Sequence, residues 1–321
     1  MKPFVSKGFS LVELMIAITI AFIILLAISQ VFVASNATQS TLVDATRLNE
    51  AGRFAISLIG NEARKAGLRN VWEPGSSATN FCASNTTQGG ASIIGCNDQG
   101  NPLGQPPYTA FDPTTPSNLA VVPPTMTCGG NGNGQVANGS DVLRVRYRGD
   151  DTTGSSSVFD CQGNAVVRDA LVEDTLYIAS DTTTGEPALF CYSSNSNTAL
   201  ALIPGIESMQ LLYGEDTDTD GTANRYVPWH LVSNPDNVVS IIASFVIRSP
   251  NAVANADISA TPFDLFGSTY AASRVTNQDG GARFTPSTTP FVAGAGAPST
   301  NTRLRTQIST EIAIKNYRDC N

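Results

Sequence analysis

Three aspartates at alternate positions form the clearest candidate metal site in this sequence. Asp216, Asp218 and Asp220 are followed directly by Gly221 and Thr222. The spacing matches positions 1, 3, 5, 6 and 7 of a calcium loop, where carboxylates and one backbone carbonyl surround the ion and glycine permits a sharp turn. Clustered carboxylates also repel one another unless a cation is present. We therefore expect a weak Ca²⁺ site here.

The same loop departs from a complete EF-hand at its far end. Position 12, which would carry a bidentate glutamate, is Val227. A further ligand would have to come from Asn224 or Glu215. The alternative interpretation is a solvated hairpin turn that is acidic but holds no ion.

A different carboxylate, Glu13, lies in an apolar stretch. After Glu13 no charged residue occurs until Asp44, and residues 9–33 are long enough to cross a bilayer. The run is too long for the core of a cleavable secretory signal, and a carboxylate in it is unfavourable unless a cation neutralises it. Lys2 and Lys7 precede the run and predict a cytoplasmic N-terminus, with everything after the span outside the inner membrane.

The cysteines favour disulfide bonds over a metal centre. The sequence has one histidine, His230, and no CxxC pair, so it has few of the ligands that a zinc site requires. Cys161 and Cys191 flank an apolar segment, residues 171–178, that has the pattern of a strand, and we expect these two to pair. The pairing of the other four is open: Cys82, Cys96, Cys128 and Cys320.

Composition argues against nucleic-acid binding and against catalysis. With 27 acidic and 19 basic residues the formal net charge is −8, which leaves no basic patch for a polyanion. The chain lacks a second histidine, a G-x-S-x-G motif and an S-x-x-K motif, so a hydrolase would miss its usual nucleophile and base. We expect an exported protein that is not an enzyme.

A single long helix should position Glu13. No proline occurs between Pro3 and Pro74, so the spanning helix can continue to about residue 67, a length of roughly 85 Å. Its second half is amphipathic. One stripe contains Leu48, Ala51, Ala55, Leu58, Ile59 and Ala66, and the opposite side contains Glu50, Arg53, Asn61 and Arg64.

The remainder of the chain has the pattern of antiparallel strands interrupted by two insertions. Strands are predicted at residues 141–148, 175–179, 189–192, 205–213, 238–248 and 306–317. The insertions, residues 73–137 and 250–302, are rich in Gly, Pro, Ser, Thr and Asn. The predicted architecture is α+β, with the long helix packed on one antiparallel sheet.

The N-terminal motif resembles a known export signal. Residues 7–13 read KGFSLVE, which resembles the class III signal of type IV prepilins. The resemblance implies a pilin-like fold, cleavage between Gly8 and Phe9, methylation of the new amine, and pairing of Glu13 with the N-terminus of an adjacent subunit. It divides the chain into a leader (1–8), a membrane and assembly half of the stem (9–35), an amphipathic half (36–67) and a globular domain (68–321).

Further segments resemble the PilW family of pilus assembly proteins. They are RLNEAGRF at 47–54, NEAR at 61–64, the region from Cys161 to Tyr192, and YGEDTDTDG at 213–221. The resemblance and the chain length imply a minor pilin of a tip or initiation complex that primes pilus assembly, serving twitching motility and adhesion. Implied partners are other minor pilins, the major pilin, the prepilin peptidase, the inner-membrane assembly platform and a PilY-type tip adhesin.

Two alternatives remain open. One is a J-type minor pseudopilin of a type II secretion system, whose filament assembles in the same way. The other is a tip adhesin in which the insertions provide the binding surface. In each case the protein begins as a single-pass inner-membrane protein with a periplasmic domain, and as a pilin it reaches the cell surface after assembly.

Overall fold

A computed structural model gives the fold of the chain. It describes residues 10–68, 91–96, 140–150, 157–181, 184, 186–252, 261–274, 282–286 and 303–315. Gly8 and Phe9 lie outside these residues, as do Cys82, Cys128, Cys320 and the side chain of Cys96.

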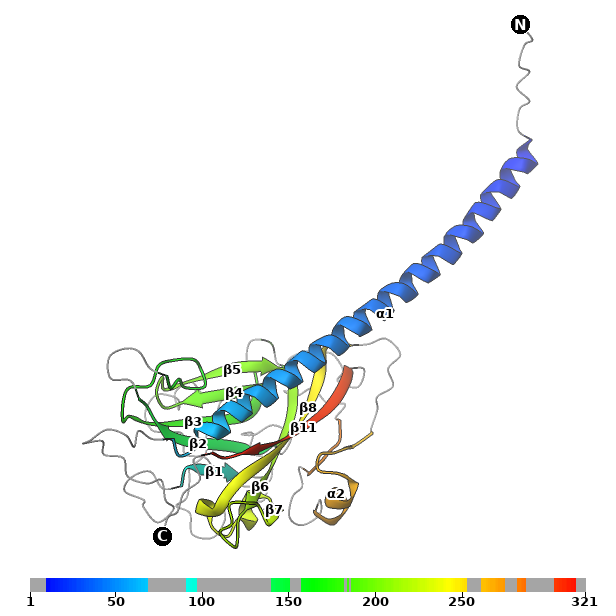
Figure 1. Ribbon diagram of the computed structural model, residues 1–321. Coiled ribbons are helices and arrows are strands. Elements are labelled where there is room, and N and C mark those ends of the chain that lie inside the picture. Colours follow the sequence, from blue (N-terminus) through cyan, green and yellow to red (C-terminus); the bar gives the residue numbers. More distant parts are fainter. Residues whose placement is uncertain are drawn as a thin grey trace.

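A single helix, α1 (Leu11–Lys65), projects far beyond the rest of the molecule (Figure 1). At 1.5 Å per residue its 55 residues span about 83 Å. The first thirty residues are exposed on all sides, whereas the second half lies on the domain with one stripe buried. This is the helix predicted from the absence of proline, and it ends two residues before the predicted position.

The first sheet contains five antiparallel strands in the order β1-β2-β3-β4-β5. They are β1 (Ile93–Cys96), β2 (Val142–Arg148), β3 (Leu171–Ser180), β4 (Pro187–Ser193) and β5 (Thr198–Pro204). Consecutive strands pair, so local connections build the whole sheet.

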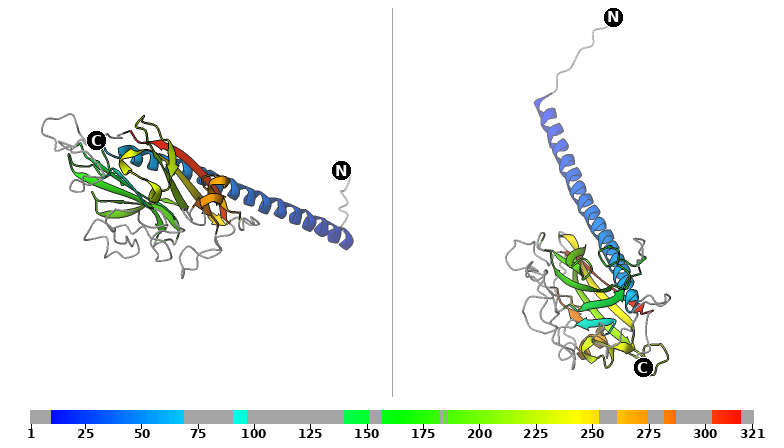
Figure 2. Two further views of the ribbon diagram at one scale, coloured as in Figure 1. Left: turned by 90° about the horizontal axis from the view of Figure 1, so that it is seen from below. Right: turned by 90° about the vertical axis from the view of Figure 1, so that its left-hand side faces the viewer.

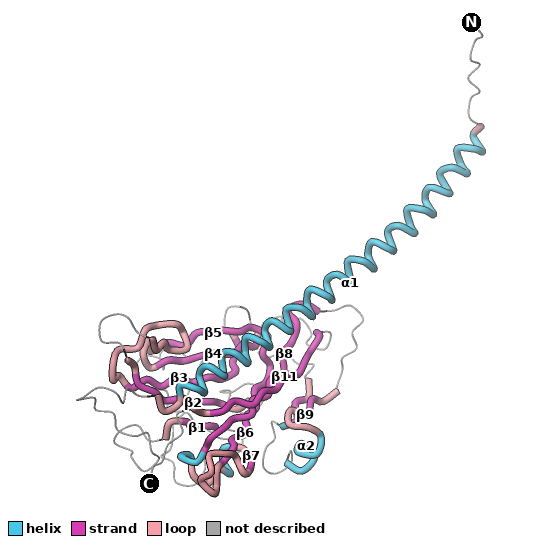
Figure 3. Tube along the Cα trace, viewed as in Figure 1, coloured by secondary structure: helices cyan, strands magenta, loops and turns pink. Residues whose placement is uncertain are grey.

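The second sheet has the order β11-β8-β6-β7 and is also antiparallel. Its strands are β6 (Ile206–Glu215), β7 (Arg225–Val227), β8 (Val238–Ala252) and β11 (Arg303–Ala313). The views from two further directions show α1 running along β8 and β11 (Figure 2). Figure 3 shows the same arrangement as a trace, with helix and strands distinguished by colour.

Gly205 joins the two sheets. It is the single residue between β5 and β6 and has φ of 85°, a conformation that favours glycine. Its amide donates to the Pro187 carbonyl in the first sheet, and its carbonyl accepts from the Arg248 amide in the second. The chain therefore changes sheet in one residue without losing backbone hydrogen bonds.

One hydrophobic core unites α1 and both sheets. Its most buried members include Ile59 of α1, Leu176 of β3 and Phe245 of β8. A smaller cluster covers the outer side of β8, where Val246 meets Leu265 and Phe284. Those two residues come from a small unit made of β9 (Phe263–Asp264), α2 (Ser268–Arg274) and β10 (Arg283–Phe284).

The α+β architecture agrees with the prediction, and every predicted strand overlaps an observed one. The strands form two main sheets, however, and not one. The insertions are also not purely loops in the part of the chain described. The first contributes β1, and the second contributes the β9-α2-β10 unit and the end of β8.

Candidate functional site: the stem helix and its attachment

The exposed half of α1 presents apolar side chains with nothing packed against them among the described residues. Phe22, Leu25 and Phe32 are all more than 60% exposed. By length and composition this helix can cross a membrane. The exposed surface needs either lipid or other helices to cover it, because isolated apolar side chains of this size are unfavourable in water.

Glu13 lies in the first turn of this exposed half. Its carboxylate accepts a hydrogen bond from the Ser10 amide at 3.1 Å, which satisfies one of the free amides at the helix start. Glu13 is exposed, so its carboxylate is available to a partner. The predicted charge pairing with a neighbouring N-terminus stays a prediction, since Gly8 and Phe9 lie outside the described residues.

The second half of α1 attaches to the sheets through the predicted stripe. Leu48, Ala55, Ile59 and Ala66 are buried, and the predicted polar side is exposed. Gly52 permits the closest approach, because a Cβ there would lie 3.1 Å from Ile247 of β8 and 3.2 Å from Ile308 of β11. The amphipathic pattern therefore identified the packed face of the helix correctly.

A buried polar cluster fastens the end of α1 to the first sheet. The Lys65 ammonium lies 2.8 Å from the Glu62 carboxylate and 3.4 Å from Asp174 of β3, and it donates to the Phe159 carbonyl at 2.8 Å. The Tyr147 hydroxyl of β2 donates to Asp174 at 2.6 Å. Four segments distant in the sequence thus meet at one cation.

Burial changes the protonation of this cluster. The pKa of Glu62 is raised to about 8, mainly by loss of solvent; Lys65 opposes this rise, and the nearby Asp174 carboxylate adds to it. At neutral pH Glu62 is therefore mostly protonated, and the Lys65 ammonium lies between it and the Asp174 carboxylate, which also accepts from the Tyr147 hydroxyl. The pKa of Tyr147 is raised by burial and by Asp174, so this phenol remains a donor.

The predicted disulfide lies next to this cluster. Cys161 and Cys191 are bonded, with their Cα atoms 6.3 Å apart, which confirms the pairing expected from the sequence. The Cys161 amide donates to Asp174 at 2.9 Å. The cross-link therefore holds one of the donors that fix Asp174 beneath Lys65.

The acidic loop between β6 and β7 brings its three aspartates together. One carboxylate oxygen from each of Asp216, Asp218 and Asp220 lies within 4.8 Å of the others. Asp216 accepts hydrogen bonds from the amides of Thr219 and Gly221, both at 2.7 Å. The loop geometry is thus partly set by its own backbone donors, with Thr219 and Gly221 at positive φ.

The remaining residues expected at this loop are engaged elsewhere. Thr222 donates through its amide and its hydroxyl to Asp220. Asn224 accepts from Thr217, and Glu215 is held by Arg225 and Ser233. The pKa of Glu215 is lowered because these hydrogen bonds outweigh the effect of burial. Calcium binding stays a prediction, with the three aspartates as its candidate ligands.

Sequence reasoning missed the cluster around Lys65. Glu62 falls within the apolar stripe, and a carboxylate there was the available signal of a buried polar contact. Its partner Asp174 is far away in the sequence, on a strand whose polar residues would ordinarily face solvent. Only the packing of α1 against β2 and β3 brings the two together.

Comparisons with known proteins identify two family models and one solved structure that this chain resembles. The family model for the prokaryotic N-terminal methylation motif matches residues 4–29, and that for Type IV Pilus-assembly protein W (PilW) matches residues 175–316. No curated protein matches the chain significantly. One solved structure, a type IV-like pilin from Thermus thermophilus, is similar at 12% sequence identity. The alignment covers 58% of this chain and 82% of the Thermus chain. Its TM-score is 0.28, which says nothing about function.

A methylation motif that leads into a single apolar helix, with an antiparallel domain attached to the outer half of that helix, defines a type IV prepilin. The chain is anchored in the membrane by one pass and carries a periplasmic domain. The PilW match covers the second half of the first sheet and all of the second, and together with the methylation motif it identifies a PilW-like minor pilin of a type IV pilus. Domains of this family are structural.

Proposed function

We propose that this minor pilin joins the complex that primes assembly of a type IV pilus and then occupies the pilus tip. The observation that supports this is the division of α1 into an attached half and a half with exposed apolar side chains. Such a subunit is incomplete by itself, because its exposed stem must exchange lipid for other stem helices when it leaves the membrane.

The size of the domain favours the tip over the shaft. The part of the chain that the structure describes already contains two sheets, and the sequence has a further 22, 43 and 16 residues at positions 69–90, 97–139 and 287–302. A shaft subunit is surrounded by copies on several sides, whereas a tip subunit has free space above it. The partners proposed are other minor pilins, the major pilin, the prepilin peptidase, the assembly platform and a PilY-type adhesin.

The proposal is tested by counting and labelling pili. Deleting the gene should reduce the number of pili strongly, and the wild-type chain should restore it. An epitope placed after residue 315 should be detected by immunogold only at pilus ends. Label spaced along the shaft, or a normal number of pili in the deletion strain, would contradict the proposal.

A further inference from the structure

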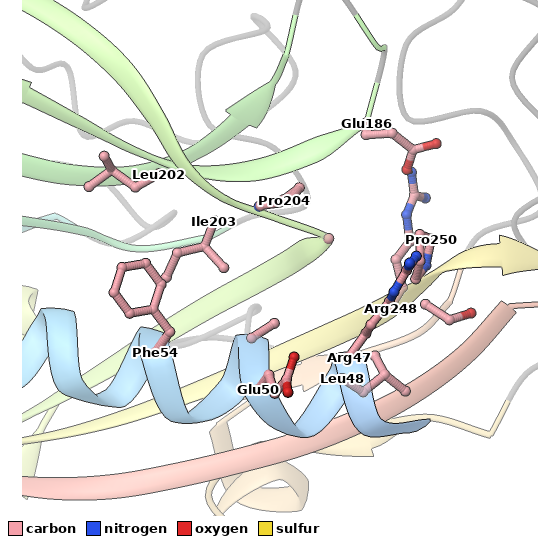
Figure 4. A pocket seen from close by; sticks show the side chains of 13 residues that line it. Arg47, Leu48, Glu50, Phe54, Glu186, Leu202, Ile203, Pro204, Arg248 and Pro250 are labelled. Carbon is pink, nitrogen blue, oxygen red and sulfur yellow. The ribbon is translucent and has the colours of Figure 1, made fainter. Parts of the chain in front are cut away.

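A groove of about 460 Å³ lies between the second half of α1 and the turn from β5 to β6 (Figure 4). Phe54 and Leu48 line it from the helix, while Leu202, Ile203 and Pro204 line it from the strand. Phe54 is 55% exposed although it faces an apolar wall. The groove is therefore a largely apolar surface at the point where the stem leaves the domain.

The polar end of the groove holds a buried arginine that forms two ion pairs. Arg248 is 4% exposed, and its terminal nitrogens contact Glu207 at 3.0 Å and Glu186 at 2.5 Å. Both carboxylates are shared, since Arg303 binds Glu186 and Arg305 binds Glu207. This network of ion pairs closes the polar end of the groove, so the open part of the groove is its apolar side.

Two charged residues stand at the mouth of the groove on the helix side. Arg47 and Glu50 are exposed, one turn apart, and neither forms an ion pair in the part of the chain that the structure describes. A helix lying parallel to α1 would match them with an acidic residue followed one turn later by a basic residue.

The groove side of α1 continues into the exposed stem. Counting back from Phe54 by the helical repeat leads through Arg47 to Val43, and then to Phe32 and Leu25. Val43 is 45% exposed and the other two are more exposed still. A helix that packs against the stem on this side would therefore reach the groove without changing direction.

We infer that the groove receives the stem helix of a neighbouring pilin subunit, an inference that rests on the proposed function. The incoming helix places apolar side chains at positions i, i+3 or i+4, and i+7 against Phe54 and the β5 wall. Its acidic residue meets Arg47, and its basic residue meets Glu50. The groove thus fixes where along the stem the neighbour sits.

Site-specific photo-crosslinking in the full-length protein tests the inference in piliated cells. Benzoylphenylalanine replaces Phe54 in one variant and Phe159 in a control, because both are phenylalanines of similar exposure, 55% and 48%. We expect position 54, and not position 159, to give an adduct whose partner peptide maps by mass spectrometry to the stem helix of another pilin. Adducts to lipid, to a globular domain or at background level would overturn the inference.

Charge reversal then tests how the neighbour is recognised. Arg47→Glu should lower the position-54 adduct several-fold, while Arg53→Glu, exposed on the same helix but outside the groove, should leave it unchanged. An equal response to both reversals would overturn the role of Arg47. If deletion of the gene leaves the number of pili normal but the position-54 adduct forms, the groove assignment holds and the proposed priming function is wrong. If deletion abolishes pili but no adduct forms at position 54, the priming function is supported and the groove assignment is wrong.

Discussion

Position along α1 decides what a carboxylate does in this protein. Glu13 is exposed and only caps its own helix, so its charge remains available to another molecule. Glu62, on the same helix, is 3% exposed and is neutralised by its surroundings. We therefore expect the first to act between subunits, whereas the second acts within one.

Replacing Glu13 should impair assembly without weakening the domain. We expect Glu13→Gln to lower the number of pili, because the amide cannot neutralise the ammonium of a neighbouring N-terminus. The melting temperature of the domain should not change, since the Glu13 side chain is exposed and its hydrogen bond is to Ser10 at the far end of the stem. Thr19→Ala is a matched control, because Thr19 bonds only to its own helix. Normal piliation of the Glu13 variant would refute the pairing.

Calcium should stabilise the domain through the acidic loop. With three aspartates as ligands, a dissociation constant on the order of 10⁻⁴–10⁻³ M is expected, so 10 mM Ca²⁺ should add about 1–3 kcal/mol to the free energy of unfolding. Asp218→Asn should abolish this gain, and Glu50→Gln, which removes a distant carboxylate, should not. Thermal melts of residues 36–321 with calcium and with chelator measure the effect. Equal melting temperatures with calcium and with chelator would show that the loop is an acidic turn that binds no calcium.

At the scale of elements, the attachment of α1 to β2 and β3 should depend on pH. Burial raises the pKa of Glu62 from its usual 4.5 to about 8, so between these pH values the folded state binds a proton that the unfolded state has lost. The free energy of unfolding should therefore fall as the pH rises from about 5 to about 8.

Glu62→Gln should remove this part of the pH dependence. The amide keeps the shape of the protonated acid but carries no titrating proton, so the variant should gain on the order of 1 kcal/mol or more over wild type at pH 8 and little at pH 5. Glu50→Gln, exposed on the same helix, should follow wild type at both pH values. Denaturant unfolding at the two pH values measures the difference, and parallel wild-type and Glu62→Gln curves would contradict the assignment.

The sequence predicted those elements whose pattern is local. The α1 stripe and strands such as β2 and β8 repeat with a clear period, so burial could be inferred from position alone. β5 was missed because it is an edge strand, TALALIP, whose apolar residues do not alternate and are largely exposed. The number of sheets was also missed, since it depends on the single-residue turn at Gly205, which no strand pattern reveals.

At the site, prediction succeeded where one segment carries the information. The spacing of Asp216, Asp218 and Asp220 placed them in one loop, and the cysteines flanking β3 were paired correctly. The contact of Lys65 with Asp174 joins a helix to a strand more than a hundred residues later. Neither residue has a local pattern that identifies its partner.

At the scale of the whole molecule, the exposed stem and the domain should be thermodynamically independent. Residues 10–40 are exposed and pack on nothing described, so removing residues 1–35 should shift the melting temperature of the domain by less than about 2 °C relative to full-length protein in detergent. Circular dichroism measures the melting temperatures of the truncated and the full-length protein. A truncation ending at residue 55 is the contrasting control, because it removes Leu48 and Ala55 from the core and should destabilise the domain severely.

The course of α1 along β8 and β11 has a mechanical consequence. When a pilus pulls on a surface, tension enters this subunit at the far end of its stem and travels along the helix axis. Because the buried half of the helix lies lengthwise on two long strands, that tension loads its whole contact area in shear at once, and does not peel it away turn by turn. At the end away from the pull, Lys65 joins the helix to Asp174 of β3 and so adds an ion pair to the contact that resists sliding.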